Sequence, residues 1–247
     1  MLMIILFATG LFAGVVDAIA GGGGLITLPV LLSTGMPPHL AFGTNKLQAI
    51  VGTFTAVKRY HRHGLISFSD MYTGLFFGLI GSISGAIAAQ VLSTEILHKI
   101  IPILLATVLI YTLITPKLGL KDQEPRMSRL WFYILFGFGL GFYDGFFGPG
   151  VGSMYVFFLT FFLGYNLIKA TAYTKVLNLN SSTIAALCFI LGGNVDYRIA
   201  ACMAAGQFIG GRLGASLAIN KGARVIRPLF LMMVTSTIAV LVYKAVS

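Results

Sequence analysis

The sequence predicts an all-α, polytopic membrane protein, and three observations lead to this fold class. Hydrophobic residues make up 57% of the chain and charged residues only 10%, whereas ordinary soluble domains carry roughly 25% charged residues. The mean hydropathy is +0.91. Long apolar runs also recur along the whole chain. We therefore expect about eight long transmembrane helices and two short half-helices.

Each long run approaches or exceeds the roughly 20 residues that an α-helix needs to cross a bilayer. The runs are Met1–Ala20, Ala41–Val57, Met71–Leu92, Leu97–Thr115, Leu130–Phe147, Leu167–Leu191, Ile199–Ile219 and Val225–Tyr243. Two shorter runs, Leu25–Thr34 and Val151–Gly164, follow glycine clusters. At about 1.5 Å per residue these two are too short to cross comfortably, so we expect half-helices there.

The chain consists of two similar halves. AFGTNKLQA, starting at Ala41, corresponds to ATAYTKVLN, starting at Ala170, which places Lys46 and Lys175 in register 129 residues apart. Duplication of this kind is common in transporters. It predicts three parts, which are a first transmembrane repeat (1–115), a cytoplasmic linker (116–128) and a second transmembrane repeat (129–247).

The glycine clusters leave the orientation of the two halves open. If residues 1–34 form one discontinuous span, the halves are parallel; if they form a hairpin that enters and returns, the halves are inverted. Basic residues concentrate on the cytoplasmic side of membrane proteins, and the inverted arrangement collects more of them on one side. We therefore prefer inverted repeats, with both termini outside and the linker in the cytoplasm.

Each half contains a glycine break inside an apolar region, DAIAGGGGLI from Asp17 and DGFFGPGVGS from Asp144. In hydrocarbon, broken backbone is tolerated only where protein or a watery cavity satisfies its polar groups. The amides that start the next helix carry partial positive charge and attract anions. We expect substrate-binding amides at Gly22, Gly23, Gly24, Gly150 and Gly152.

Glycines also serve close helix packing, which is the alternative interpretation of these breaks. Packing is the interpretation that we prefer for a second group of glycines, because they recur every three or four residues and so share one helix face. This group contains Gly74, Gly78, Gly81, Gly85, Gly206, Gly210 and Gly214.

Lys46 and Lys175 lie in apolar surroundings, where a charge costs about 2.5–3.5 kcal/mol on insertion scales. Two matched lysines therefore suggest an anion-binding site. Each lies only a few residues into its helix, so it could instead extend to the membrane interface. The hydrogen-bonding residues expected beside the lysines are Asn45, Gln48, Thr174 and Asn178.

Asp17 and Asp144 are matched carboxylates inside the predicted membrane region. Three roles fit them: an ion pair with the lysines, a cap on the broken helix, or a proton-binding group during transport. The sequence does not separate these roles.

Several other classes of function are disfavoured. The net charge of +10 comes mostly from residues at segment ends, which indicates membrane topology rather than nucleic-acid binding. Cys188 and Cys202 lie in apolar segments without the spacing of a metal or redox site, so we expect no metal and no cofactor. HExxH and GxSxG are absent, so we expect no enzyme.

The sequence GLFAGVVDAIAGGGGLITLPVLL, then AFGTNKLQAIVGT, then YDGFFGPGVGS resembles the TauE/SafE family of sulfite exporters, also called the toluene-sulfonate uptake permease family, and particularly its YfcA-like members. The resemblance covers essentially the whole chain. It implies a multi-pass protein of a bacterial or archaeal cytoplasmic membrane that moves sulfur-containing anions. Val151 stands where many relatives would have another glycine. The two glycine loops are therefore not expected to contribute equally to the site.

The sequence thus predicts a secondary transporter, and more specifically an exporter, of small sulfur oxyanions such as sulfite or of organosulfonates. Its partners would be the lipid bilayer, the anion and a coupling proton. Alternating access around an anion site at the membrane midplane is the expected mechanism. A passive anion channel and a membrane scaffold without a substrate are the alternatives.

Overall fold

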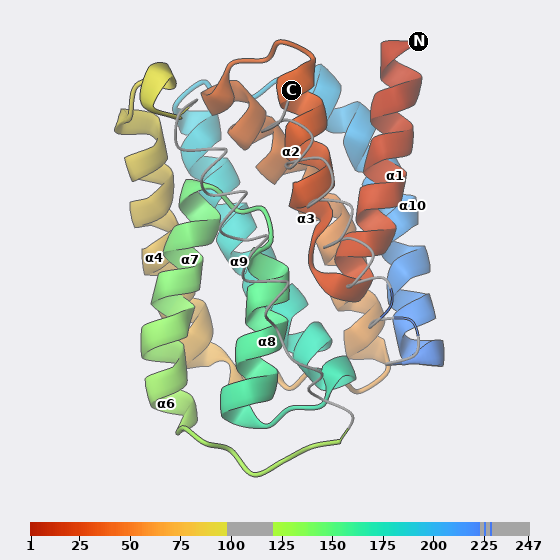
Figure 1. Cartoon of the computed structure of the whole chain (residues 1–247), viewed down its shortest axis with the longest axis vertical. Helices are drawn as coiled ribbons and strands as arrows, with labels where there is room; N and C mark the ends of the chain where they lie inside the picture. Colours follow the sequence, from red (N-terminus) through yellow and green to blue (C-terminus); the bar gives the residue numbers. More distant parts are fainter. Residues whose placement is uncertain (98–120, 223–224, 226–227, 229–247) are drawn as a thin grey trace, which may run out of the picture.

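The computed structural model describes residues 1–97, 121–222, 225 and 228, and its regular structure is helical (Figure 1). The prediction of an all-helical protein is confirmed for these residues. In chain order, the elements are α1 (Leu2–Ala20), α2 (Gly23–Ser33), α3 (Pro38–Arg62), the 3-10 turn η1 (Phe68–Asp70), α4 (Tyr72–Val91), α6 (Arg129–Phe132), the π-helical turn η2 (Tyr133–Gly137), α7 (Phe138–Phe146), α8 (Val151–Leu163), α9 (Leu167–Leu191) and α10 (Tyr197–Lys221).

Three of the described helices, α1, α4 and α9, are long and apolar enough to cross a membrane. Helices α3 and α10 contain 25 residues each and cover two further predicted spans, but polar side chains make them less apolar. The predicted half-helices are present as α2 and α8, with 11 and 13 residues. The predicted spans Leu97–Thr115 and Val225–Tyr243 lie almost wholly outside the described residues.

The predicted helix Leu130–Phe147 is present, but it is not uniform. It begins as α6, widens into the π-helical turn η2 and continues as α7. At the end of η2, the hydroxyl of Tyr155 donates a hydrogen bond of 3.4 Å to the carbonyl oxygen of Gly137. Such π-helical turns inside α-helices often occur near functional positions. The helix that follows, α7, contains Asp144.

Both glycine breaks reverse the chain direction and so produce hairpins. Helix α1 ends at Ala20, and the following Gly21 has a left-handed φ of 76°. Helix α2 then returns toward the end where α1 began (Figure 1). Gly148 and Gly150 have φ values of 97° and 83° and separate α7 from α8 in the same way. Left-handed backbone is accessible to glycine without a Cβ clash, which explains why glycines occupy these turns.

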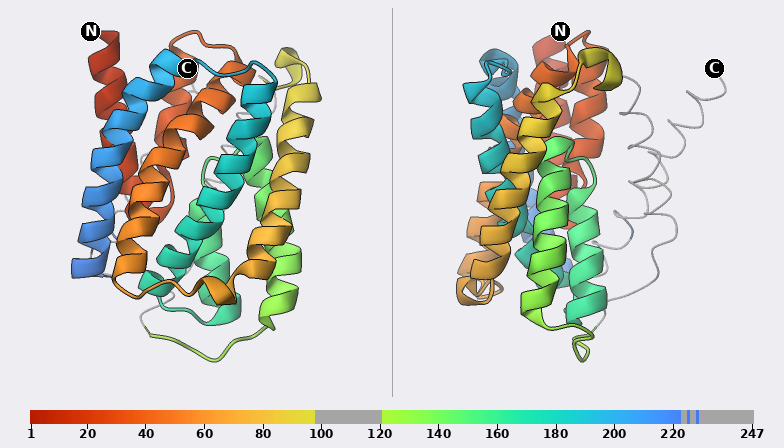
Figure 2. Two further views of the ribbon diagram at one scale, coloured as in Figure 1. Left: turned by 180° about the vertical axis from the view of Figure 1, so that it is seen from behind. Right: turned by 90° about the vertical axis from the view of Figure 1, so that its left-hand side faces the viewer.

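The helices pack into two bundles, and each bundle combines both sequence halves. One bundle contains α1, α2, α3 and α10; the other contains α4, α6, α7, α8 and α9. These bundles occupy the right and left of Figure 1. They meet where α3 lies beside α9, with α1 also touching α8 and α9. Helices α3 and α9 run in opposite directions (Figure 2).

The regularly spaced glycines hold each bundle together, as the packing interpretation predicted. A Cβ atom at Gly85 of α4 would lie 2.0 Å from the carbonyl oxygen of Phe142 in α7. A Cβ atom at Gly210 of α10 would lie 2.1 Å from the carbonyl oxygen of Leu11 in α1. Real Cβ atoms do not approach backbone so closely, and only glycine allows these helix axes to come together.

We expect Gly85→Ala to lower the stability of the protein by about 1–3 kcal/mol, because the added methyl group must push α4 away from α7. Gly139→Ala is the matched control, since a Cβ atom there meets nothing within 4 Å. Thermal unfolding of the purified protein in detergent measures both changes. Equal melting temperatures for the two variants would contradict the packing role.

Candidate functional site

The two glycine breaks contact each other in the interior. A Cβ atom at Gly21 would lie 2.5 Å from the carbonyl carbon of Gly152, and one at Gly152 would lie 2.4 Å from the carbonyl oxygen of Gly21. The hydroxyl of Ser153 donates a hydrogen bond of 3.1 Å to the carbonyl oxygen of Ala20. The break of each half therefore rests on the break of the other half.

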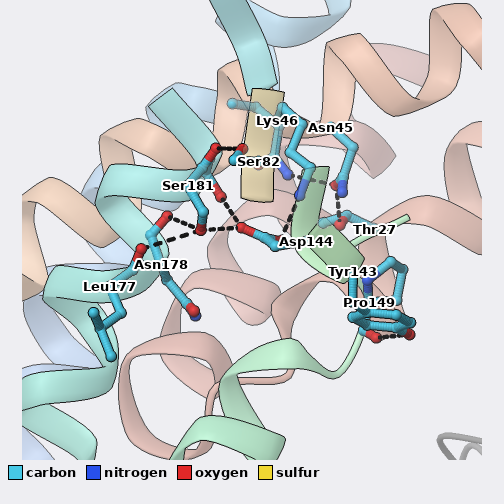
Figure 3. Close-up of polar contacts among 12 residues, drawn as sticks. Thr27, Asn45, Lys46, Ser82, Tyr143, Asp144, Pro149, Leu177, Asn178 and Ser181 are labelled. Atoms are coloured by element: carbon cyan, nitrogen blue, oxygen red, sulfur yellow. Dashed lines mark hydrogen bonds and ion pairs between the residues drawn. The ribbon is translucent and has the colours of Figure 1, made fainter. Parts of the chain in front are cut away.

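Lys46 forms an ion pair with Asp144 across the two bundles (Figure 3). The ammonium of Lys46 on α3 lies 2.5 Å from the carboxylate of Asp144 on α7, and both side chains are 3% exposed. Ser181 and Ser182 of α9 also donate hydrogen bonds to this carboxylate, the latter at 3.2 Å. Asp144 thus accepts hydrogen bonds from three donors, and these offset the free-energy cost of burying its charge.

Lys175 forms the reciprocal ion pair with Asp17. Its ammonium on α9 lies 2.9 Å from the carboxylate of Asp17 on α1. The other carboxylate oxygen accepts a hydrogen bond of 3.3 Å from the amide of Gly23, at the start of α2. Asp17 therefore combines two of the roles that the sequence left open, the ion pair and the helix cap. The Asp17 side chain remains 18% exposed, whereas that of Lys175 is fully buried.

The alternative in which the lysines extend to the membrane interface is wrong, because both ammonium groups are buried on carboxylates. The ion pair, one of the roles that the sequence left open for Asp17 and Asp144, is formed with both lysines. Each lysine is neutralised by the aspartate of the other sequence half. An anion can reach either ammonium only in competition with a carboxylate.

A small polar network orients the amide of Asn45. The Thr27 hydroxyl and the Gln48 amide donate hydrogen bonds of 2.5 Å and 3.0 Å to the side-chain oxygen of Asn45. Asn45 itself lines the cavity described below. Gln48 itself does not line that cavity, and its own side-chain oxygen is buried without a partner among the described residues. Gln48 thus contacts the site through its hydrogen bond to Asn45.

A cavity of about 40 Å³ lies between the ion pairs and the glycine breaks. One water molecule needs roughly 10–15 Å³ on the same measure, so the cavity can hold a small polyatomic anion or a few waters. Its lining residues come from both halves and are Asp17, Gly21, Gly23, Gly24, Asn45, Lys46, Ala49, Thr53, Asp144, Gly148, Gly150, Val151, Asn178, Ser182 and Gln207.

Most residues predicted for the site therefore meet at one cavity, but not all of them line it. Gly22, Gln48, Gly152, Thr174 and Lys175 lie outside the lining. Lys175 touches the cavity only through its partner Asp17, and Gly152 supports the opposite glycine break. The Thr174 hydroxyl is buried without a partner among the described residues.

Four polar residues of the site, Thr53, Ser181, Ser182 and Gln207, were not predicted from the sequence. The serines follow Asn178 by three and four residues on α9, a helical spacing that could have revealed them. Gln207 is 2% exposed and lies in the close contact of α10 with α1 and α3. A Cβ atom at Gly52 would lie 2.3 Å from its side-chain oxygen. No local pattern indicates that this glutamine reaches the cavity.

Buried compensated charges, two broken helices and a cavity between two bundles define the class of this protein. In membranes, charged side chains at this depth face the protein interior and mark substrate or ion pathways. Broken helices that meet near such charges are typical of secondary transporters. The chain is therefore an integral, multi-pass membrane protein of the transporter class.

Comparison with known proteins identifies the family of this chain. Residues 6–241 match the family described as "Sulfite exporter TauE/SafE", and the chain belongs to this family of membrane transporters. It is 42% identical over 245 residues to the Escherichia coli K12 protein "Probable membrane transporter protein YfcA", which covers 99% of this chain and 91% of the relative. The resemblance seen in the sequence motifs is confirmed.

Other relatives are similar to the chain over most of their length. A Haemophilus influenzae "Probable membrane transporter protein" is 43% identical over 242 residues, with 98% of this chain and 95% of the relative covered. The Bacillus subtilis "Probable membrane transporter protein YunE" is 25% identical, with 90% and 89% covered. No solved structure matches the chain.

We expect Lys46→Met to lower the free energy of unfolding by about 3–5 kcal/mol, because it leaves the carboxylate of Asp144 buried without its cation. The double variant Lys46→Met/Asp144→Asn should recover much of this loss. Lys58→Met, at an exposed position of the same helix, serves as the control. Melting temperatures in detergent measure the effect, and additive losses in the double variant would show that the pair is not coupled.

Proposed function

We propose that this chain is a secondary transporter that exports small sulfur-containing anions, such as sulfite or organosulfonates, by alternating access. The observation that carries the proposal is the meeting of both glycine breaks beside two lysines that reach across the bundles. The family description "Sulfite exporter" supports the substrate class. Ammonium groups, an amide NH₂ and backbone N–H groups are donors suited to a trigonal or tetrahedral oxyanion.

In this proposal, the two sequence halves are inverted repeats. The matched lysines lie on α3 and α9, which run in opposite directions (Figure 2). The hairpins α1–α2 and α7–α8 enter from opposite ends of the molecule (Figure 1). Both observations support the inverted arrangement, and inverted repeats around a central site are a common basis of alternating access.

The moving bodies of the proposed cycle are the two bundles rather than the two sequence halves. Glycine contacts lock α1 to α10 within one bundle and α4 to α7 within the other. Both lysine–aspartate pairs join one bundle to the other. Rocking of the bundles therefore has to lengthen or exchange these two contacts. In this proposal, the anion binds at the same groups that change partners during the conformational change.

A proton on Asp17 would free Lys175 for the anion. Asp17 is the more accessible carboxylate, with an exposed fraction of 18% against 3% for Asp144. It is also held by fewer donors, since Asp144 receives hydrogen bonds from Lys46, Ser181 and Ser182. In the proposed cycle, Asp144 keeps its hydrogen bonds to Lys46 and the serines, and Asp17 couples proton movement to anion movement.

The size of the cavity favours a small substrate. Its volume of about 40 Å³ is far below the roughly 300 Å³ of pockets that enclose drug-sized ligands. An anion such as sulfite is closer to this size than an aromatic sulfonate, which would require the bundles to separate first.

We expect sulfite flux in liposomes to saturate and to respond to an imposed proton gradient. Asp17→Asn keeps the size of the side chain but cannot ionise, so it should lose most of the gradient-driven flux. Glu124→Gln, at an exposed position of the linker, is the control. Saturable flux that ignores the gradient would remove the proton-coupling part of the proposal. Unsaturable flux that ignores the gradient would replace the transporter by a channel.

Binding of the anion should also stabilise the purified protein, by about 2.7 kcal/mol at 100 times the dissociation constant. Thermal unfolding against sulfite, thiosulfate, sulfate and sulfonates measures this effect. Lys46→Gln and Lys175→Gln should lose the stabilisation, whereas Lys58→Gln should keep it. If no anion stabilises the wild-type protein, a scaffold without a substrate is favoured; if both buried-lysine variants still respond, the site is misplaced.

A further inference from the structure

The charges at the central cavity balance one another. Asp17, Lys46 and Asp144 line the cavity, and Lys175 adds the second positive charge through its pair with Asp17. The two ion pairs therefore offer no net charge to an incoming anion. The affinity for an oxyanion then depends on neutral polar groups that form hydrogen bonds with it.

Five neutral side chains with hydrogen-bonding groups belong to the described lining, namely Asn45, Thr53, Asn178, Ser182 and Gln207. Two of them are already engaged. The side-chain oxygen of Asn45 accepts two hydrogen bonds, and the Ser182 hydroxyl donates to Asp144. The place of Gln207 in the fold separates it from the remaining two, because it comes from α10, whereas Thr53 and Asn178 lie on α3 and α9.

Gln207 reaches the cavity through a slot made by two glycines of the neighbouring helices. A Cβ atom at Gly14 of α1 would lie 2.8 Å from the Gln207 side-chain oxygen, and one at Gly52 of α3 would lie 2.3 Å from it. No other residue of α10 belongs to the described lining. A side chain held in this way loses little further conformational freedom when it binds a ligand.

The other half of the sequence has no such group at the corresponding place. With the 129-residue offset that aligns the lysines, Gln207 corresponds to Gly78 of α4, which is absent from the described lining. Gly52 corresponds in the same way to Ser181, whose hydroxyl donates to Asp144. A serine of α9 thus serves the Asp144 carboxylate, whereas on the Asp17 side a glycine of α3 leaves room for the Gln207 amide.

We propose that Gln207 sets the affinity of the central site for its anion, by donating a hydrogen bond to one oxygen of the substrate from the Asp17 side of the cavity. This inference rests on the proposed anion-transport function. Because the amide is neutral, it adds a donor without changing the charge that the two ion pairs balance. Anion affinity and proton coupling are thereby assigned to different residues, Gln207 and Asp17.

The test measures sulfite flux into liposomes that contain the full-length protein. Gln207→Met keeps the length of the side chain but removes its hydrogen-bonding group. We expect the KM for sulfite to rise about tenfold, because one hydrogen bond to a charged group is lost. The maximal rate and the response to a proton gradient should stay as in the wild-type protein. Gln123→Met, at an exposed position of the linker, is the matched control and should keep the wild-type KM.

Gly52→Ala tests the same contact from the neighbouring helix. The added methyl group has to displace the end of the Gln207 side chain, so the KM should again rise. The double variant Gly52→Ala/Gln207→Met should have no higher KM than Gln207→Met alone, because both changes remove one interaction. Melting temperatures in detergent verify that each variant is folded.

The outcomes separate this inference from the proposed function. A raised KM with an unchanged maximal rate in Gln207→Met supports the assignment. A lowered melting temperature with an unchanged KM would overturn it and make Gln207 a packing residue. If the wild-type protein shows saturable sulfite flux and Gln207→Met has the same KM, only this inference fails. If the wild-type protein shows no saturable sulfite flux, the proposed function fails and the role of Gln207 fails with it.

Discussion

Two lysine–aspartate pairs that cross between the helix bundles are the interaction on which the interior of this protein depends. Lys46 reaches from α3 to Asp144, and Lys175 reaches from α9 to Asp17. Each charge would be strongly destabilising if it were buried alone. The bundles therefore have to dock so that both pairs form together. The same requirement places Asp17, Lys46 and Asp144 in the lining of one cavity, with Lys175 paired to Asp17.

Glycine makes this docking possible in two different ways. Regularly spaced glycines such as Gly85 and Gly210 bring helix backbones into contact within each bundle. The left-handed glycines of the breaks, such as Gly21, turn the chain back inside the apolar region. Because Gly21 also packs directly on Gly152, both breaks meet at the bundle boundary. Close packing and broken helices, which the sequence presents as alternatives for glycine, thus occur together.

The two lysine–aspartate pairs are similar but not equivalent. Asp144 is surrounded by donors and nearly inaccessible, whereas Asp17 caps α2 and remains partly exposed. Val151 follows the second break where the first half has Gly24, and it lines the cavity. The two lysine–aspartate pairs therefore differ in the donors around their carboxylates and in the access to them.

Much of the fold and part of the site could be predicted from the sequence. Hydropathy predicts helices such as α4 and α9, glycine predicts the breaks, and the repeated motif predicts that Lys46 and Lys175 occupy matching places. The serines around Asp144 and the lining residue Gln207 could not be predicted in the same way, because their roles depend on helices that are distant in sequence.

The sequence by itself determined the local features of the chain, namely its apolar helices, its breaks and the register of its two lysines. These follow from hydrophobicity and backbone freedom, which act within a few residues. Only the tertiary structure decided which lysine meets which aspartate. That choice depends on α4 packing with α7 and α10 packing with α1, and such packing exchanges helices between the halves in a way that no local pattern records.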